Sequence, residues 1–394
     1  MARTEFPGKA THAQTRAHNA SLVLRALYDL GPISRAEIAR LTGLTRTSVG
    51  ELVAELETEG LAEDIGRGPS TGGKAPTLVA LIDDARHVVT LDLGERTFTA
   101  GLLNLRGTIR HRATRDLQGA DGDAALALVT DLIDEILAGE HNPILGIGVG
   151  TPGIVGEDGT IRWAVNLSWA DLPLGKILQT RYQLPTIVAN DSRAAAIATY
   201  LFGGEDRPSN LVAIKVGRGI GAGLVLNGEL FAGDGDGAGE IGHIVVEPDG
   251  AECHCGRFGC LETVASAPAI LRAAEGAGLG AGGPGGLTLT DLAAAARAGD
   301  GTALAVVHAA GRALGTAIAN LIGILDVREI VVHGSVTALG EPWLDAIRDE
   351  ATRRSLGPLS RETRLIDGGT GDDLTLLGAA AMLLTRELGL TVHR

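Results

Sequence analysis

Several kinds of residue are scarce in this chain of 394 residues. Cysteines number 3 and aromatic residues make up 3%, so a disulfide framework is not expected and Leu, Val, Ile and Ala must form most of the core. Runs of 18 apolar residues are missing, which argues against a membrane-spanning helix. Residues 1–20 are polar and lack the apolar stretch of a signal peptide, so we expect a soluble cytoplasmic protein.

An excess of positive charge is missing as well. The net charge of −14 argues against a protein that coats nucleic acid with its whole surface. The charge is uneven, because residues 1–86 contain 10 Lys or Arg and 11 Asp or Glu, whereas the remaining residues contain 24 and 37. The nearly neutral N-terminal part can therefore still present a basic face. A chain of this length has room for two or three domains.

The three cysteines all lie between residues 253 and 260, and His243 precedes them. Three thiols and one imidazole are a donor set that suits a four-coordinate zinc ion. An odd number of cysteines in a reducing compartment argues against disulfides. We predict one zinc ion per chain, bound by His243, Cys253, Cys255 and Cys260. The alternatives are His254 as the fourth ligand, which strain between ligating neighbours disfavours, and three unrelated buried cysteines.

Residues 19–65 have the pattern of a compact helical unit. Ser34 followed by Glu37 predicts a capping box at the start of a helix over residues 35–41, and Gly43 suits a left-handed turn after it. A longer helix over residues 45–59 places apolar residues at i, i+3, i+4 and i+7. This arrangement predicts a helix-turn-helix, whose second helix would present polar residues to base edges in the major groove. Those residues are Arg46, Thr47, Ser48 and Gly50.

A turn-rich segment, residues 66–76, follows and has the composition of a wing. Its two cations, Arg67 and Lys74, are candidates for contacts with phosphate groups or with the minor groove. A helix-turn-helix followed by a wing favours DNA binding. The alternatives are a helical capping domain with a solvated loop, and a module that contacts another protein.

From residue 87 the pattern becomes rich in strands. Three apolar strands come first, over residues 87–93, 97–105 and 108–114, and alternating helices and strands continue to a last helix over residues 374–388. Three strands of antiparallel type followed by alternating strands and helices, twice in one chain, predict an α/β fold. We expect an actin-like or ribonuclease-H-like fold with two lobes and a cleft between them.

Two motifs are more specific than this pattern. One reads Ala-Gly-Glu-Ile-Gly-His over residues 238–243 and continues as Cys-x-Cys-Gly-x-x-Gly-Cys-x-Glu over residues 253–262; the other reads Leu-Pro-Thr-Ile-Val-Ala-Asn-Asp-x-x-Ala-Ala over residues 184–195. Both closely resemble the ROK family (repressors, open reading frames, kinases), and the resemblance extends from about residue 19 to residue 385. It implies a winged helix-turn-helix domain over residues 1–86 and a sugar-binding ROK domain over residues 87–394. One lobe would be formed by residues 87–190 with the C-terminal helix, and the other by residues 191–372.

From spacing alone, Asn190 or Asp191 is the N-cap of a helix that starts at Ser192. The resemblance implies more, because the matching Asp is the catalytic base in ROK kinases and a sugar contact in ROK regulators. It also implies a set of sugar contacts, whose carboxylates and amides can each hold two adjacent hydroxyl groups. That set is Asn166, Asn190, Asp191, Glu240, His243 and Glu262. His243 would also bind zinc, and the zinc would be structural, holding the loop that directs Glu262.

The nucleotide-binding part departs from the family pattern. In ROK kinases the sequence of the first phosphate loop resembles Asp-x-Gly-Gly-Thr, whereas this chain reads Asp92-Leu93-Gly94-Glu95-Arg96 there. A carboxylate at Glu95 would repel a polyphosphate. The second loop keeps its glycines over residues 217–223 but has Arg218 where kinases commonly have threonine, and residues 331–335 resemble the adenosine segment. We therefore do not expect ATP as a cofactor, and Asp191 would be vestigial or a sugar contact.

Together these features predict a sugar-responsive transcriptional regulator, acting as a repressor of carbohydrate metabolism genes. Its expected partners are operator DNA, bound by a homodimer or a dimer of dimers, and a sugar or sugar derivative as effector. The alternatives are an active ATP-dependent sugar kinase with an attached DNA-binding domain, and a binding module whose N-terminal domain contacts protein.

Overall fold

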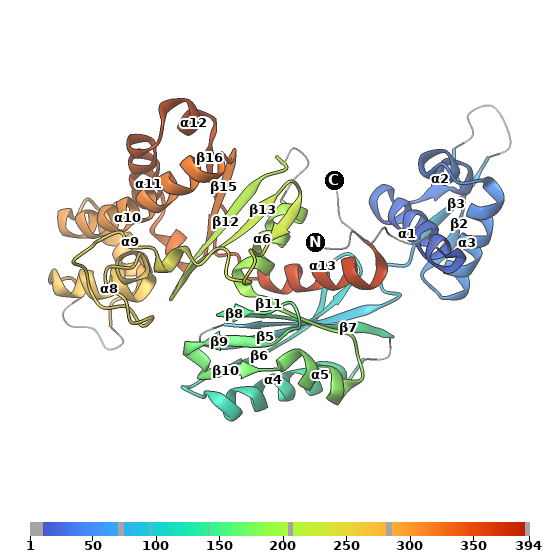
Figure 1. Cartoon of the computed structure of the whole chain (residues 1–394), viewed down its shortest axis with the longest axis horizontal. Coiled ribbons are helices and arrows are strands. Elements are labelled where there is room, and N and C mark those ends of the chain that lie inside the picture. Colours follow the sequence, from blue (N-terminus) through green and yellow to red (C-terminus); the bar gives the residue numbers. More distant parts are fainter. Residues whose placement is uncertain are drawn as a thin grey trace, which may run out of the picture.

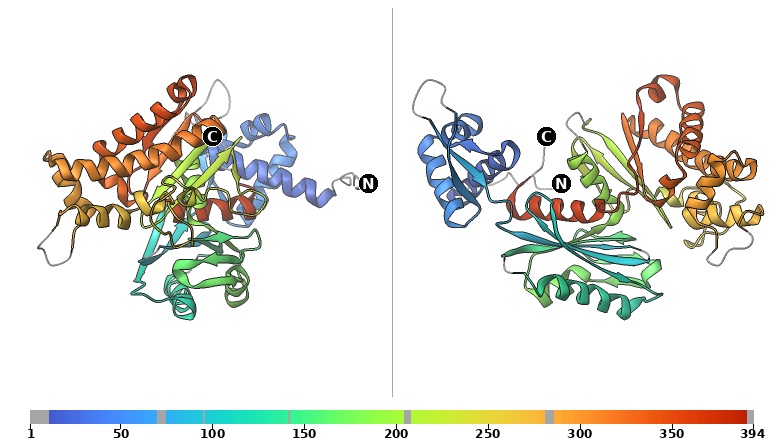
Figure 2. Two further views of the ribbon diagram at one scale, coloured as in Figure 1. Left: turned by 60° about the vertical axis from the view of Figure 1, so that its left-hand side comes forward. Right: turned by 180° about the vertical axis from the view of Figure 1, so that it is seen from behind.

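The computed structural model describes residues 11–69, 75–94, 96–140, 142–203, 208–280 and 286–390. Three units follow one another in space: an N-terminal head, a first lobe and a second lobe (Figure 1). The last helix, α13 (Leu374–Leu388), lies on the first-lobe sheet and between the other two units. The views in Figure 2 give the same arrangement.

The head is a winged helix-turn-helix with a three-stranded sheet in the order β1-β3-β2. Ser34 and Thr45 cap its second and third helices, and Gly43 between them has the predicted left-handed conformation, with φ of 71°. The Glu37 carboxylate binds Arg40 Nε at 3.0 Å, so an ion pair replaces the second half of the expected capping box. The elements are α1 (His12–Leu30), β1 (Ile33–Ser34), α2 (Arg35–Thr42), α3 (Arg46–Thr58), β2 (Ala62–Arg67) and β3 (Thr77–Leu81).

The first lobe is a five-stranded sheet in the order β6-β5-β4-β7-β11. Two helices, α4 and α5, pack on one of its faces and α13 packs on the other. A second, three-stranded sheet in the order β10-β9-β8 extends from the end of β7. The elements are β4 (His87–Leu93), β5 (Thr97–Asn104), β6 (Ile109–Asp116), α4 (Gly122–Leu137), β7 (Ile144–Thr151), β8 (Ile154–Val155), β9 (Ile161–Ala164), η1 (Val165–Leu167), β10 (Trp169–Leu172), α5 (Leu174–Tyr182) and β11 (Thr186–Asn190).

The second lobe repeats this strand order as β14-β13-β12-β15-β16. In each lobe the first three strands in chain order pair antiparallel, the fourth pairs parallel with the first, and the fifth pairs parallel with the fourth. The predicted duplicated α/β fold is therefore confirmed. Helix α6 packs on one face of the sheet, and the helices after β14 share a core with the other face. The elements are α6 (Asp191–Phe202), β12 (Leu211–Val216), β13 (Ile220–Leu226), β14 (Glu229–Phe231), η2 (Ile241–His243), α7 (Glu262–Ala265), α8 (Ala267–Gly276), α9 (Leu289–Arg297), α10 (Gly301–Leu325), β15 (Glu329–His333), η3 (Ser335–Leu339), α11 (Glu341–Arg354), α12 (Gly357–Glu362) and β16 (Arg364–Asp367).

Helix α10 is long and apolar enough to cross a membrane, and it is alone in this among the described residues. Half of its most apolar window is buried inside the second lobe, where α10 packs along α11. The core position of α10 therefore accounts for its composition.

The head and the first lobe share one hydrophobic core. Val23 and Leu27 of α1 belong to the same buried cluster as Val88 of β4 and Leu383 of α13. Arg106 strengthens this junction, because its guanidinium lies 4.5 Å from the centre of the Tyr28 ring, donates a hydrogen bond to the Tyr28 carbonyl and pairs with Asp83 at 3.0 Å. The head is thus joined to the first lobe by hydrophobic packing as well as by the covalent connection from β3 to β4.

Candidate functional site

The predicted metal ligands converge. The donor atoms of His243, Cys253, Cys255 and Cys260 all lie within 4.8 Å of one another. His243 Nδ1 is 3.6 Å from Cys253 Sγ, and Cys255 Sγ is 3.7 Å from Cys260 Sγ. Two sulfurs bound to one tetrahedral zinc ion are about 3.8 Å apart, given a Zn–S distance of about 2.3 Å. The His254 side chain is exposed and is not part of this group. The four residues therefore fit a tetrahedral metal ion.

The thiol chemistry of this cluster makes metal binding depend on pH. Burial and the neighbouring thiols of Cys255 and Cys253 raise the pKa of Cys260 to about 12, and burial also raises the pKa of Cys253. Burial opposes ionisation of Cys255 too, but hydrogen bonds from the Arg257 backbone and the other two thiols lower its pKa. Three crowded thiolates repel one another, so a metal ion must displace protons to bind here.

Glycine is required where the cysteine loop folds back on itself. Gly259, next to Cys260, has φ of 69°, and a Cβ atom there would lie 1.6 Å from the carbonyl oxygen of Glu247. Gly256 has φ of 80° between the second and third cysteines. The two glycines of the motif thus let the loop bring its cysteines together.

The metal cluster is adjacent to two of the predicted sugar contacts. His243 Nε2, on the side of the ring away from Cys253, is 4.0 Å from the Glu240 carboxylate. Burial raises the pKa of Glu240. Glu262, two residues after Cys260, accepts a hydrogen bond from the Ile220 backbone N–H at 3.0 Å. Glu262 therefore holds the second glycine loop in this structure, an attachment that sequence reasoning missed.

Asn190 forms the helix cap that spacing alone predicts. Its buried side chain accepts hydrogen bonds from the backbone N–H groups of Ser192 and Arg193 at 3.0 and 3.1 Å, and donates to the Gly153 carbonyl at 2.9 Å. It joins the start of α6 to the loop after β7. Its role as a sugar contact stays a prediction.

Asp191, the first residue of α6, has a partner that sequence reasoning missed. Its Oδ2 is 2.8 Å from Lys215 Nζ on β12, and its Oδ1 accepts from the Ser192 N–H at 2.7 Å. Burial alone would raise the pKa of Asp191, but Lys215 and the Ser192 hydrogen bonds hold it below its ordinary value. Asp92, at the end of β4, interacts electrostatically with both Asp191 and Lys215, and its pKa is raised chiefly by burial.

Asn166 lies in the first lobe, in the 3-10 turn η1, and its side chain is exposed. Close to it in sequence, Arg162 of β9 reaches across to the second lobe and binds Asp236 Oδ2 at 3.1 Å. The backbone carbonyl of Asp236 accepts a hydrogen bond from the buried Arg193 of α6. Arg162 and Asp236 thus join the two lobes by an ion pair.

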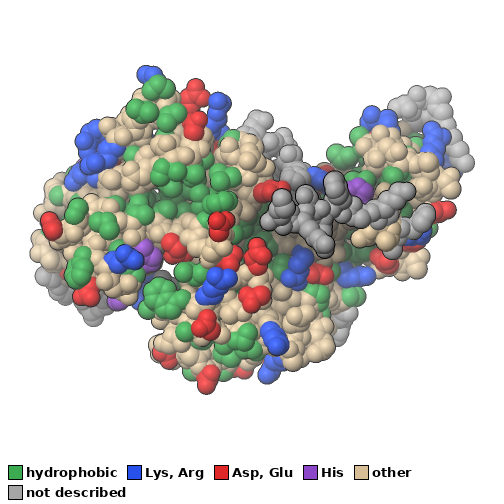
Figure 3. All heavy atoms as spheres, in the orientation of Figure 1, with side chains coloured by type: hydrophobic (Ala, Val, Ile, Leu, Met, Phe, Trp, Pro, Cys, Tyr) green, Lys and Arg blue, Asp and Glu red, His purple; other side chains and the backbone are tan. Residues whose placement is uncertain are grey.

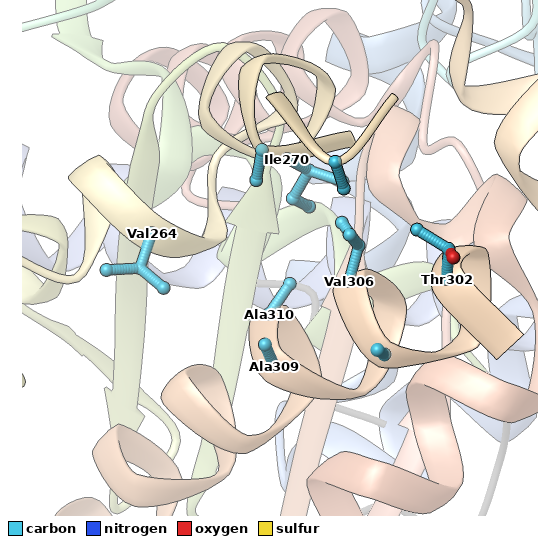
Figure 4. Close-up of a pocket in the computed structure, with 9 residues that line it drawn as sticks. Val264, Ile270, Thr302, Val306, Ala309 and Ala310 are labelled. Atoms are coloured by element: carbon cyan, nitrogen blue, oxygen red, sulfur yellow. The ribbon is translucent and has the colours of Figure 1, made fainter. Parts of the chain in front are cut away.

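A cavity in the second lobe lies elsewhere. It has a volume of about 280 Å³ and lies between α8 and α10 of the second lobe (Figure 4). Its wall is aliphatic, with Ile270, Val306 and Ala310 pointing into it and the Thr302 hydroxyl as its polar group. None of the predicted sugar contacts lines this cavity. Hydroxyl-rich ligands need convergent polar groups, so it does not suit a sugar.

The nucleotide-like loops are only partly described. Arg96 is exposed at the start of β5, and Glu95 lies outside the described residues. Arg218 is exposed in the second glycine loop, where Gly217 N–H donates to the Gly219 carbonyl at 2.9 Å. The loops can therefore be located, and the predicted loss of ATP binding stays a prediction.

The predicted DNA-contacting residues lie on the head. Arg46 and Thr47 are exposed at the start of α3, whereas Ser48 and Gly50 are half-buried and Ser48 also bonds the cap residue Thr45. Arg67 is exposed at the end of β2, and β2 and β3 form the antiparallel hairpin of a wing. Lys74 lies outside the described residues. On the face drawn in Figure 3, basic and acidic side chains are interspersed over the lobes, and basic side chains border the far end of the head.

Comparison with known proteins gives matches over both parts of the chain. The ROK family model matches residues 88–386, and the MarR family model matches residues 15–67. A xylose repressor of Caldicellulosiruptor bescii is 30% identical over 95% of this chain and 97% of its own length. A glucokinase of Halalkalibacterium halodurans is 36% identical over 77% of this chain and 96% of its own length. Among solved structures, a ROK family transcriptional regulator described as a homologue of the E. coli Mlc protein has a TM-score of 0.82, with 30% identity, 96% of this chain and 98% of its own covered.

Proposed function

This chain belongs to the ROK family, and on that premise we propose that it is a sugar-responsive transcriptional repressor that binds operator DNA through its head. One observation carries the proposal. The similarity to a repressor and to a transcriptional regulator extends over head and lobes together, whereas the similarity to a glucokinase covers 77% of the chain. The cleft between the lobes would bind the effector, and the head would bind the promoter.

The head has what major-groove recognition requires. Helix α3 starts with the exposed Arg46 and Thr47, and Arg67 is exposed at the end of β2, which pairs with β3 in the hairpin of the wing. Arginine at the start of a recognition helix can bind guanine, and a wing cation can bind phosphate. Because operators for such heads are commonly palindromic, we propose that a homodimer, or a dimer of dimers, binds one operator.

The effector would be held by hydroxyl recognition. Asn166 would contribute from the first lobe, Asn190 and Asp191 from the start of α6, and Glu240, His243 and Glu262 from the second lobe. We propose that zinc at the His243 and cysteine cluster is structural, because four protein ligands leave no position for substrate. The metal would fix the ring of His243 and the loop that ends at Glu262.

A continuous path of packed elements runs from this cleft to the head. Helix α6 begins at Asp191 and packs along α13, whose C-terminal end belongs to the core shared with α1. Gly389, just after α13, would place a Cβ atom 2.7 Å from the Ser21 hydroxyl. A sugar that changes the angle between the lobes would therefore move the head. The DNA affinity can then change by at most the differential affinity of the sugar for the two states.

A second function deserves a test because Asp191 is retained. An ATP-dependent sugar kinase would use Asp191 to accept the proton of the attacking hydroxyl. In this chain Asp191 is ion-paired with Lys215, and the first loop contains Glu95 and Arg96. A coupled assay with ATP and a panel of hexoses and pentoses should give no sustained turnover. Turnover that is lost in Asp191→Ala would favour the kinase.

Gel-shift titration with the DNA upstream of its own gene tests the repressor directly. We expect a shift that a sugar from a library weakens. Arg46→Ala should reduce operator affinity about tenfold or more, because one base-contacting arginine contributes about 1–3 kcal/mol of discrimination. Arg361→Ala, an exposed arginine of the second lobe, is the matched control and should leave affinity unchanged. The absence of any DNA shift, or a shift that Arg46→Ala does not change, would contradict the proposal.

A further inference from the structure

The first strands of the two lobes end in the same pattern with opposite charges. In the first lobe β4 ends with Asp92-Leu93 and Gly94 follows, and in the second lobe β12 ends with Lys215-Val216 and Gly217 follows. Strand order makes β4 and β12 equivalent, because each is the central strand of its sheet. Asp92 and Lys215 are therefore equivalent positions of a duplicated fold.

Both side chains interact with Asp191. Lys215 Nζ contacts Asp191 Oδ2 at 2.8 Å, and the two side chains are 33% and 16% exposed, so the pair is partly open to solvent. Asp92 Oδ1 is buried and has no hydrogen-bond partner among the described residues. Two buried carboxylates that interact electrostatically repel each other, and a cation beside them offsets this repulsion.

The charged groups that face Asp191 come from several elements. Asp92 faces it from β4 and Lys215 from β12, while Glu240 approaches from the segment before η2. Helix α13 contributes the neutral Thr375, which hydrogen-bonds Asp92. Lys215 is therefore the cation that balances this group at short range.

We propose that Lys215 is a built-in counter-ion that positions Asp191, keeping its carboxylate ionised and oriented as a hydrogen-bond acceptor for the effector without a divalent metal ion. The effector part of this inference rests on the proposed sugar-binding function. Phosphoryl transfer needs Mg²⁺ between carboxylates and phosphates, and an ammonium group in that place supplies charge without coordination sites. Lys215 thereby suits the cleft to binding rather than to catalysis.

The counter-ion role can be tested without any ligand. Lys215→Met removes the charge and keeps the length of the side chain, and it should lower the melting temperature of the zinc-loaded protein by roughly 3–6 °C at pH 8. In the variant the pKa of Asp191 is no longer lowered by an ammonium group, so its burial raises it. The carboxylate then takes up a proton as the pH falls, and the loss at pH 5 should be less than half of that at pH 8.

A double-mutant cycle separates this pairing from simple packing. In the Asp191→Asn background, Lys215→Met should lower the melting temperature by less than half as much as in the wild type. Lys215→Arg should restore most of the stability at pH 8. Lys176→Met, a change at an exposed lysine of α5, is the matched control and should have no effect at either pH.

The effector arm uses D-xylose and D-glucose in thermal-shift and calorimetric titrations. If the wild type binds one of them, Lys215→Met should weaken the affinity for that sugar about tenfold at pH 5 and less at pH 8. Lys215→Arg should have an affinity near that of the wild type. Equal losses of stability in both backgrounds and at both pH values would overturn the inference. A wild type that binds DNA but neither sugar would count against these effectors, while the ligand-free cycle would still decide the role of Lys215.

Discussion

The two lobes share one strand order and differ in what they add to it. The first lobe extends from β7 into the small sheet of β8, β9 and β10, which carries Arg162 and leads to Asn166. The second lobe extends from β14 into the loop that carries His243 and the three cysteines. A duplicated scaffold thus supplies two similar sheets, and the insertions on them supply the candidate site. The candidate binding residues therefore lie in added loops and at strand ends.

The same comparison applies to the central strands. Equivalent strand ends carry Asp92 in one lobe and Lys215 in the other, and both interact with Asp191. Two carboxylates would attract a divalent cation, whereas here the ammonium group of Lys215 already offsets part of their charge. Three predictions test how far the lobes differ, beginning with the largest expected effect.

Gly378→Ala should separate the helices that join the lobes. Gly378 of α13 faces α6, and a Cβ atom there would lie 1.8 Å from the backbone carbonyl oxygen of Ala194. Because backbone atoms can move away from this clash only at a high energetic cost, we expect a loss of about 3 kcal/mol or more in the free energy of unfolding. Gly323→Ala, in α10 of the second lobe, meets no atom within 4 Å and should be neutral or stabilise by up to about 1 kcal/mol. Urea unfolding followed by circular dichroism measures both, and equal effects would show that the α6–α13 contact is not tight.

Cys255→Ser should affect the second lobe selectively. We expect loss of one zinc ion per chain by elemental analysis, and a fall of about tenfold to a hundredfold in sugar affinity through the misplaced Glu262. His254→Ser is the control, since the His254 side chain is exposed and lies apart from the ligand cluster. A zinc-free protein that binds its sugar normally would show that the loop orders itself without metal.

Acid should weaken the two lobes unequally. Hydrogen bonds from Arg353 lower the pKa of Glu350 in the second lobe to about 2, and Arg110 lowers the pKa of Asp84 beside the first lobe to about 2 as well. A lowered pKa stabilises the fold above the ordinary pKa of the carboxyl group, and this contribution is lost as the pH falls toward 2.

The two carboxylates differ in burial, because the Glu350 side chain is 5% exposed and that of Asp84 is 41% exposed. We therefore expect Glu350→Gln to cost about 2 kcal/mol at pH 7, and Asp84→Asn, which water screens, to cost less than about 1 kcal/mol. Chemical unfolding at pH 7 and pH 3 measures both. The cost of Glu350→Gln should shrink at pH 3, and a cost that does not depend on pH would contradict this assignment.

Local chemistry could be predicted from the chain because its determinants are neighbours in sequence. Ser34 and Thr45 cap helices a few residues away, and the cysteines come together through a loop of eight residues with glycines at its turns. The second half of the predicted capping box does not form, because Arg40, one turn further along the helix, binds the Glu37 carboxylate. This competitor is also a neighbour in sequence. Strand patterns predicted the duplicated fold because alternation and chain order are visible without coordinates.

The head, the two-lobed fold and the His243–cysteine cluster could be predicted from the chain alone, since caps, periodicity and close spacing act over short stretches of sequence. Only the tertiary structure decided that Lys215 pairs with Asp191, that Glu262 binds the N–H of Ile220 and that the head shares a core with α13. These contacts join residues that are tens to hundreds of positions apart. Their energies depend on burial and distance, which exist only once the sheets and helices have packed.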